Sequence, residues 1–117
     1  MTGANVIVKL GNRLVGDGQP ALVVAELGIN HNGSVETAVK MVREAAACGA
    51  DAVKVQAFSA PSFVTPHATW KGERQIDMFK RYELSPVQLA EIAHECRRLG
   101  VMFIGTPDSA QHAEVLL

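Results

Sequence analysis

Polar side chains stand beside apolar runs at three places in the sequence. Glu26 directly follows the apolar residues 21–25, Lys54 and Gln56 alternate with valines, and Thr106 follows a third apolar run. Burying a carboxylate at the end of an apolar strand costs free energy unless a partner compensates its charge, so such a residue is kept for a partner or for a function. A lysine ammonium beside an amide is suited to binding phosphate or carboxylate. These residue types predict acid–base chemistry on a small anionic substrate.

Each of these residues also has a structural explanation. Glu26 and Lys54 on neighbouring strands can form a salt bridge that only neutralises both charges, and Glu26 can instead contact a cation. Thr106 begins the turn Thr-Pro-Asp, which can bind phosphate at a helix N-terminus or simply cap the helix. The two interpretations of Lys54 are compatible, because one lysine can pair with a carboxylate and bind an anion.

The elements that must position these residues alternate between strand and helix. From the first predicted strand to the second is about 30 residues, the size of one βαβ unit, which predicts an α/β fold with a parallel sheet. In such folds sites form at the carboxyl ends of the strands, where the polar residues stand. We predict a hairpin over 6–15, strands over 21–25, 52–56 and 101–104, and helices over 35–48, 75–82, 86–99 and from 110 onward.

Local signals support several of these elements. The run 21–25 lacks alternation, which predicts a strand buried on both faces. Ser85 and Gln88 form a capping box, and Ser109 or Asp108 caps the last helix. The irregular stretch 57–83 is long enough to be a functional loop. The buried stripe of the helix after Ser85 is predicted to hold Leu89, Ile92, Ala93, Cys96 and Leu99.

Composition excludes several classes of protein. The 117 residues carry a formal net charge of −1 with scattered lysines and arginines, which gives no sign of nucleic acid or a membrane surface as partner. The sequence has neither a membrane-spanning apolar run nor a signal peptide, so we expect a cytoplasmic protein. Cys48 and Cys96 are interpreted as small buried residues in a reducing compartment.

The glycine-rich segment after the first strand is a candidate active-site loop. Asn30, His31 and Asn32 follow one another there, and His31 can contact a ligand or a metal ion. The other histidines, at positions 67, 94 and 112, have no metal-ligand spacing.

Four segments of the chain resemble the N-acetylneuraminate synthase family, which includes sialic, pseudaminic and legionaminic acid synthases. They are AELGINHNGSVETA (25–38), GADAVKVQAF (49–58), MFKRYELS (78–85) and GTPDS (105–109). The leading hairpin is also typical of this family, so the resemblance extends over nearly the whole chain. It implies a (β/α)₈ TIM barrel, of which residues 1–117 would be the N-terminal hairpin and the first three βα units, truncated and without a C-terminal antifreeze-like domain.

The resemblance also implies a reaction. Phosphoenolpyruvate condenses with the aldehyde of an N-acetylated amino sugar, N-acetylmannosamine in the sialic acid case, and phosphate leaves. Glu26 resembles the family's acid–base carboxylate, and Lys54, Gln56 and Thr106 its phosphoenolpyruvate contacts. A divalent metal, usually Mn²⁺, acts as a Lewis acid, with ligands expected outside this chain. The complete enzyme is expected to be a homodimer.

Two residues depart from the family pattern. Gly105 replaces a serine, and Asp108 replaces a phenylalanine, where its charge would repel a phosphate. Two alternatives stay open: a catalytically inactive barrel fragment or small interaction module, and a related aldol-type phosphoenolpyruvate synthase of the shikimate or octulosonate kind.

Overall fold

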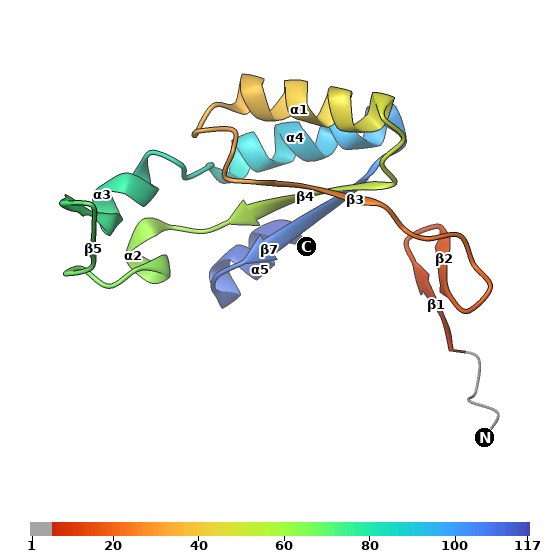
Figure 1. Ribbon diagram of the computed structural model, residues 1–117, viewed down its shortest axis with the longest axis horizontal. Coiled ribbons are helices and arrows are strands. Elements are labelled where there is room, and N and C mark those ends of the chain that lie inside the picture. The colour runs from red at the N-terminus through yellow and green to blue at the C-terminus, as the bar shows by residue number, and fades with distance from the viewer. Residues whose placement is uncertain (1–5) are drawn as a thin grey trace.

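The core of the protein is a parallel three-stranded sheet covered on one face by two helices. A computed structural model describes residues 6–117. The strand order is β3 (Val24–Gly28), β4 (Ala52–Ala57) and β7 (Met102–Pro107), and both pairings are parallel. The crossovers contain α1 (Val35–Ala47) and α4 (Pro86–Leu99), which lie side by side above the sheet (Figure 1). This is the α/β arrangement that the alternating sequence pattern predicts.

Two smaller substructures extend from opposite ends of the sheet (Figure 1). At the amino end of the strands lies an antiparallel hairpin, β1 (Ile7–Leu10) and β2 (Arg13–Gly16). At the carboxyl end lies a segment that we call the β4–α4 excursion, residues 59–84. Its elements are α2 (Ala60–Phe63), β5 (Thr69–Trp70), β6 (Glu73–Arg74) and α3 (Gln75–Lys80). Of these four elements, the sequence predicted only the helix α3.

Local signals in the sequence account for the boundaries of the two covering helices. Ser34 Oγ accepts a hydrogen bond from Thr37 N at 3.1 Å and begins α1. Ser85 and Gln88 form the predicted capping box at the start of α4. Gly100 ends α4 with φ +71°, a left-handed conformation that glycine adopts without steric cost.

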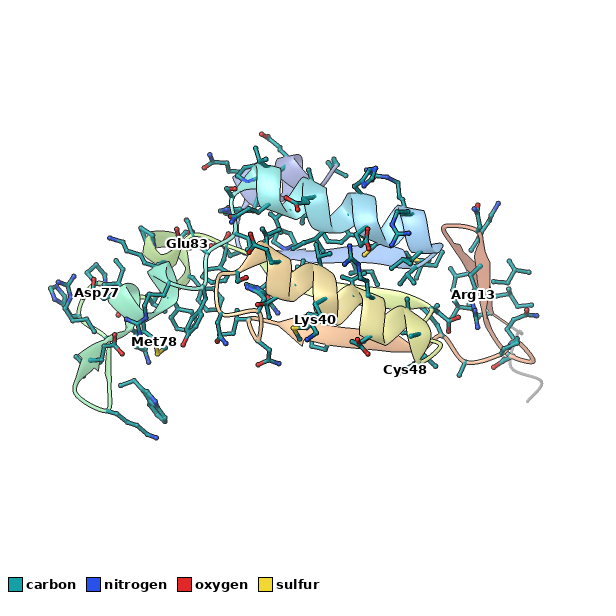
Figure 2. The ribbon with its side chains drawn as sticks, turned by 90° about the horizontal axis from the view of Figure 1, so that it is seen from above. Arg13, Lys40, Cys48, Asp77, Met78 and Glu83 are labelled. Carbon is teal, nitrogen blue, oxygen red and sulfur yellow. The ribbon has the colours of Figure 1, made fainter. Side chains whose placement is uncertain are left out.

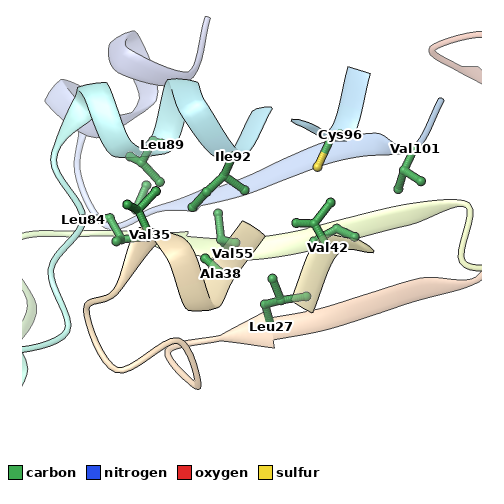
Figure 3. Close-up of a cluster of buried hydrophobic side chains, with 12 residues drawn as sticks. Leu27, Val35, Ala38, Val42, Val55, Leu84, Leu89, Ile92, Cys96 and Val101 are labelled. Carbon is green, nitrogen blue, oxygen red and sulfur yellow. The ribbon is translucent and has the colours of Figure 1, made fainter. Parts of the chain in front are cut away.

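The hydrophobic core lies between the sheet and these helices (Figure 3). Val53 and Val55 are completely buried beneath α1 and α4, whereas Lys54 and Gln56 alternate with them and lie on the other face. Of the predicted α4 stripe, Leu89, Ile92 and Cys96 are buried. Ala93 and Leu99 are half-buried.

The prediction that the first strand is buried on both faces is wrong. Val23 is 54% exposed and Val24 is 40% exposed. The described helices cover only one face of the sheet, so alternate residues of β3 remain open to solvent. The strand also begins later than predicted, because pairing starts at Val24 opposite Ala52, the first residue of β4. Glu26 consequently lies inside β3 rather than after its end.

The third strand, like the first, begins and ends later in the sequence than predicted. It extends from Met102 to Pro107 rather than over 101–104, because residues 105–107 continue the pairing with β4. Thr106 therefore lies in the strand and not in the first turn of a helix. The following helix, α5 (Ala110–Leu116), is capped by Ser109, whose side chain accepts from His112 N.

An ion pair attaches the hairpin to the sheet. Arg13 contacts the carboxylate of Asp51, and its guanidinium also donates to Ala21 O at 3.1 Å. Asp51 Oδ2 accepts from Val23 N at 2.8 Å. Asp51, the residue before β4, therefore connects the hairpin to the backbone just before β3.

The two cysteines differ in exposure. Cys96 is fully buried in α4, and this burial raises the pKa of its thiol to about 11. Cys48 is exposed at the C-terminal end of α1 (Figure 2), so its predicted burial is wrong. The reason is that Cys48 lies one residue past the end of α1, outside the buried stripe formed by Val35, Ala38 and Val42. Within residues 6–117, no helix has the length and apolarity needed to cross a membrane.

Burial of Ile92 predicts a large effect on stability. Replacing Ile92, which is fully buried, with alanine is expected to lower the free energy of unfolding by about 2–5 kcal/mol, through lost apolar contacts and a residual cavity. Val87 on the same helix is 78% exposed, so Val87→Ala is the matched control and should change stability by less than about 0.5 kcal/mol. Urea denaturation measures both values. Equal effects would contradict the packing of α4 on the sheet.

A charged network joins α1 to α4. Glu95, nearly buried on α4, accepts from Arg43 Nε at 2.6 Å and from Arg98 Nε at 2.9 Å. The guanidinium groups of Arg98 and Arg43 lower the pKa of the Glu95 carboxyl to about 2. The sequence pattern did not identify Glu95, because a glutamate near the apolar stripe does not by itself reveal its distant partner Arg43.

The lowered pKa of Glu95 predicts how stability depends on pH. Because the unfolded-state pKa of a glutamate is about 4.3, the stabilisation is present above that pH and is lost as the pH falls toward about 2. Glu95→Gln should therefore unfold at lower urea concentration than the wild type at pH 7, and the difference should shrink toward pH 2. Glu91→Gln, on an exposed position of the same helix, is the control. A pH-independent difference would contradict the ionic contribution.

Candidate functional site

The structure brings Glu26 and Lys54 into contact on the face of the sheet opposite α1 and α4. Glu26 and Lys54 are register partners on adjacent parallel strands, and Lys54 Nζ lies 2.7 Å from Glu26 Oε2. The two side chains keep 47% and 34% of their exposure, respectively. Ion pairs this accessible typically stabilise a fold by only about 0–1 kcal/mol. Stability alone therefore gives little reason to place two charges on these strands.

Gln56 and Thr106 are neighbours of this pair on the same face. Gln56 is two residues beyond Lys54 along β4, or about 7 Å at the rise of a strand, so both side chains project from one face. Thr106 is the register partner of Gln56 on β7. The four predicted residues thus form a polar strip across three strands near their carboxyl ends. We call this strip, Glu26, Lys54, Gln56 and Thr106, the strand-end site.

An irregularity in β3 orients the carboxylate of Glu26. Glu26 pairs with Lys54 and Gly28 pairs with Val55, so Leu27 is an extra residue in the ladder. Gly28 adopts φ +55°, and its N–H donates to Glu26 Oε1 at 3.0 Å. This bulge buries Leu27 in the core while the Glu26 carboxylate is held by Gly28 on one oxygen and by Lys54 on the other. Bulges of this kind are common beside active sites, where they aim a side chain.

The candidate loop after β3 is folded into consecutive tight turns. Asn30 N donates to Leu27 O and Asn32 N donates to Ile29 O, each at 3.0 Å. The Asn30 and Asn32 side chains are exposed. A Cβ on Gly33 would lie 2.0 Å from Arg81 O, so the loop packs directly against the backbone that follows α3. Glycine is required at this close approach.

His31 is completely buried within this loop. Its Nδ1 accepts from Gly33 N at 3.0 Å, which assigns the ring proton of the neutral form to Nε2. Nε2 has no hydrogen-bond partner among the described residues. Burial lowers the pKa of His31, and the nearby Gly28 backbone offsets this only in part. His31 is therefore an uncharged side chain at neutral pH that holds the shape of the loop.

The carboxylate of Asp108 faces the loop that follows β4. Its Oδ2 accepts from Ser62 Oγ at 2.5 Å and from Ser59 N at 3.3 Å. His112 Nδ1 lies 2.7 Å from Oδ1, an ionic contact when the imidazole is protonated. Burial raises the pKa of Asp108, but hydrogen bonds from the Ser62 and Ser109 side chains outweigh this and keep the pKa below its ordinary value. Its Oδ2 is thus engaged by Ser59 and Ser62, whereas Oδ1 is buried without a hydrogen-bond partner among the described residues and faces His112.

The second departure from the family pattern, Gly105, has a packing explanation. A Cβ on Gly105 would lie 2.5 Å from a methyl carbon of Leu116. Leu116 is part of α5 and packs against the hydrophobic core. A serine at position 105 would require this side chain to move, so the glycine suits the way α5 packs on β7.

The described residues do not fit a metal site by themselves. No three histidine, cysteine, aspartate or glutamate side chains within residues 6–117 lie close enough together to hold a metal ion. Glu26 is the acidic member of the strand-end site, and its oxygens contact Lys54 and Gly28. A divalent metal ion would therefore need ligands in addition to the described residues.

Comparison with known proteins identifies the relatives of this chain. A family model described as "NeuB family" matches residues 41–117. An uncharacterized protein of Methanocaldococcus jannaschii is 36% identical over 93% of this chain and 31% of its own length. The N,N'-diacetyllegionaminic acid synthase of Campylobacter jejuni is 31% identical over 81% of this chain and 31% of its own length. The chain thus spans about a third of the length of these curated relatives.

Solved structures show the same fold. The N-acetylneuraminic acid (sialic acid) synthetase of Leptospira borgpetersenii, solved in complex with citrate, superimposes with a TM-score of 0.86 at 24% identity and covers 96% of this chain and 38% of that chain. The spore coat polysaccharide biosynthesis protein SpsE of Bacillus subtilis gives a TM-score of 0.72 at 28% identity, over 95% of this chain and 30% of that chain. The family model, these relatives and the shared fold confirm the resemblance read from the sequence motifs: the chain belongs to the NeuB family.

Proposed function

We propose that this chain forms part of an enzyme that condenses phosphoenolpyruvate with the aldehyde of an N-acetylated amino sugar to give a sialic-type acid and phosphate. The observation that carries the proposal is the strand-end site, where a carboxylate, an ammonium, an amide and a hydroxyl share one open face at the carboxyl ends of three parallel strands. Membership of the NeuB family supports the same reaction class.

We assign anion binding to Lys54, Gln56 and Thr106. Phosphoenolpyruvate carries a phosphate and a carboxylate, which need a cation and hydrogen-bond donors close together. Lys54 and Gln56 lie on one strand and Thr106 lies beside Gln56 on the next, so the three donors span the length of such a small molecule. Lys54 can stay near Glu26 while one of its other N–H groups contacts the anion, since an ammonium has three donors.

We assign proton transfer to Glu26. In the condensation, C3 of phosphoenolpyruvate bonds to the aldehyde carbon, water bonds to C2, and the C2–O bond to phosphate breaks. The attacking water loses two protons: the carboxylate can carry one of them to the aldehyde oxygen, and the other leaves with the phosphate as C2 becomes a carbonyl. The hydrogen bond from Gly28 N holds the carboxylate in a defined orientation for this role.

The remaining parts of the proposal concern the complete protein. We propose that the three βα units belong to a (β/α)₈ barrel of about 250 residues, which supplies the sugar contacts and the ligands of a divalent metal. That metal would act as a Lewis acid on the aldehyde. We also propose a homodimer that functions in the cytoplasm, without nucleic acid or a membrane as partner.

The decisive experiment measures phosphate release by the complete protein that contains this sequence, with phosphoenolpyruvate and N-acetylmannosamine. With ¹⁸O in the bridging C2–O–P position, the label should appear in the released phosphate. No release with any N-acetylated amino sugar would overturn the proposal. Turnover with phosphorylated sugar aldehydes that lack the N-acetyl group would instead identify a synthase of the shikimate or octulosonate kind.

A test of the 117-residue chain alone examines a third possibility, that the chain is an independent interaction module. We expect it to release no phosphate, because the sugar contacts are proposed to lie elsewhere. A monodisperse, cooperatively melting protein of 12.5 kDa that does not bind phosphoenolpyruvate would favour an independent interaction module. Robust turnover by this chain alone would contradict the need for further residues.

A further inference from the structure

The β4–α4 excursion has a small aromatic core of its own. Phe63 packs between Phe58 and Phe79, with ring centroids 5.0 and 4.9 Å apart, and Tyr82 lies 6.4 Å from Phe79. These rings join α2 to α3. The two helices of the excursion are therefore held together, and Phe58, the residue after β4, connects them to the end of that strand.

Two carboxylates attach that base at the start of α2. Glu83, at the far end of the excursion, accepts from Ala60 N. Asp108, at the end of β7, accepts from Ser59 N and from Ser62 Oγ. One carboxylate thus connects the two ends of the excursion, and the other connects the excursion to the neighbouring strand.

The carboxylate end of the attachment through Asp108 is largely buried, whereas Ser62 is exposed. The Asp108 side chain is only 7% exposed, and the facing His112 ring is 16% exposed. Ser59 Oγ lies 2.7 Å from Ser62 Oγ, so the two hydroxyls form a hydrogen bond next to the carboxylate. The bond from Ser59 N is partly buried, and hydrogen bonds to a charged acceptor are stronger than those between neutral groups.

This attachment lies directly beside the strand-end site. Asp108 is two residues after Thr106, and Ser59 is three residues after Gln56. Asp108 N also donates to Ala57 O at 3.1 Å, so the backbones of the two strands remain paired up to this point. In Figure 1 the excursion lies beyond the carboxyl end of β4, the end of the strands near which the substrate is proposed to bind.

We propose that Asp108 is a positioning residue that fastens the β4–α4 excursion as a fixed wall of the phosphoenolpyruvate site. It acts through Ser59 and Ser62 rather than by touching the substrate. The attachment engages Oδ2 of its carboxylate, whose charge would repel a phosphate if both oxygens were free. The kinetic part of this inference rests on the proposed function, whereas the structural part does not.

The test compares Asp108→Ala with Asp108→Asn in the complete protein. Alanine removes the oxygen that accepts both hydrogen bonds, and we expect the KM for phosphoenolpyruvate to rise about tenfold while kcat changes less than about threefold. Asparagine keeps one oxygen that can accept from Ser59 and Ser62, so it should restore most of the affinity. Glu114→Ala, which removes an exposed carboxylate from α5, is the matched control and should match the wild type.

Hydrogen–deuterium exchange gives a readout that does not require activity. The amides of residues 57–64 should exchange faster in Asp108→Ala than in the wild type, Asp108→Asn and Glu114→Ala, while those of α1 and α4 stay protected. Unchanged exchange in 57–64, or an unchanged KM, would overturn the inference. If the wild type itself releases no phosphate, the proposed function fails, and the exchange comparison alone decides whether Asp108 fastens the excursion.

Discussion

Replacing Glu26 with glutamine in the complete enzyme should lower kcat by about 100-fold or more, the usual contribution of a general acid–base group. Glutamine keeps the size of the side chain and its contact with Gly28 N, but it cannot take up a proton. The KM for phosphoenolpyruvate should change less than about threefold, because substrate binding is assigned to other residues. Steady-state kinetics with varied phosphoenolpyruvate separates the two parameters.

The control for Glu26→Gln is the same substitution at an exposed position. Glu44 lies on the solvent side of α1, so Glu44→Gln should leave both parameters unchanged. If Glu26→Gln weakens substrate affinity as much as turnover, its carboxylate serves only to support the site. That result would favour the structural salt bridge over the acid–base role.

Replacing Lys54 with methionine should raise the KM for phosphoenolpyruvate by about 10- to 100-fold, the range expected for a hydrogen bond to a charged group. Methionine preserves much of the apolar stem while removing the ammonium that would face the phosphate or carboxylate. Isothermal titration with phosphoenolpyruvate alone measures the same loss without turnover. Lys40→Met, at an exposed position on α1 (Figure 2), is the control.

A double substitution distinguishes the two roles of Lys54. If Lys54 served only to neutralise Glu26, its loss would matter little once residue 26 is an uncharged glutamine. We expect the opposite: the affinity defect of Lys54→Met should persist in the Glu26→Gln background. Disappearance of the defect in the double variant would show that Lys54 acts through Glu26, as the 2.7 Å ion pair alone would suggest.

The sequence predicted those parts of the fold that depend on local chemistry. The capping box of Ser85 and Gln88 and the left-handed glycine at 100 define both ends of α4. Alternation along β4 correctly separated the buried Val53 and Val55 from Lys54 and Gln56. These features depend on neighbours within a few residues, so they are readable without knowing the fold.

Strand boundaries were predicted less well, because they depend on partners that are distant in sequence. β3 begins at Val24 only because β4 begins opposite it, and β7 extends to Pro107 only because β4 extends to Ala57. The same limitation applies to the excursion, where the short elements α2, β5 and β6 carry too few residues for a periodic pattern.

By itself, the sequence determined the α/β class, the family motifs and the residue types that make a phosphoenolpyruvate site chemically plausible. Only the tertiary structure decided which residues meet: Glu26 with Lys54 across two strands, Glu95 with Arg43 between two helices, and Asp108 after β7 with Ser59 and Ser62 at α2. Pairs such as Glu26–Lys54, Arg43–Glu95 and Ser59–Asp108 are separated by tens of residues along the chain. Strand register and helix packing set their distances, and no local pattern in the sequence encodes those distances.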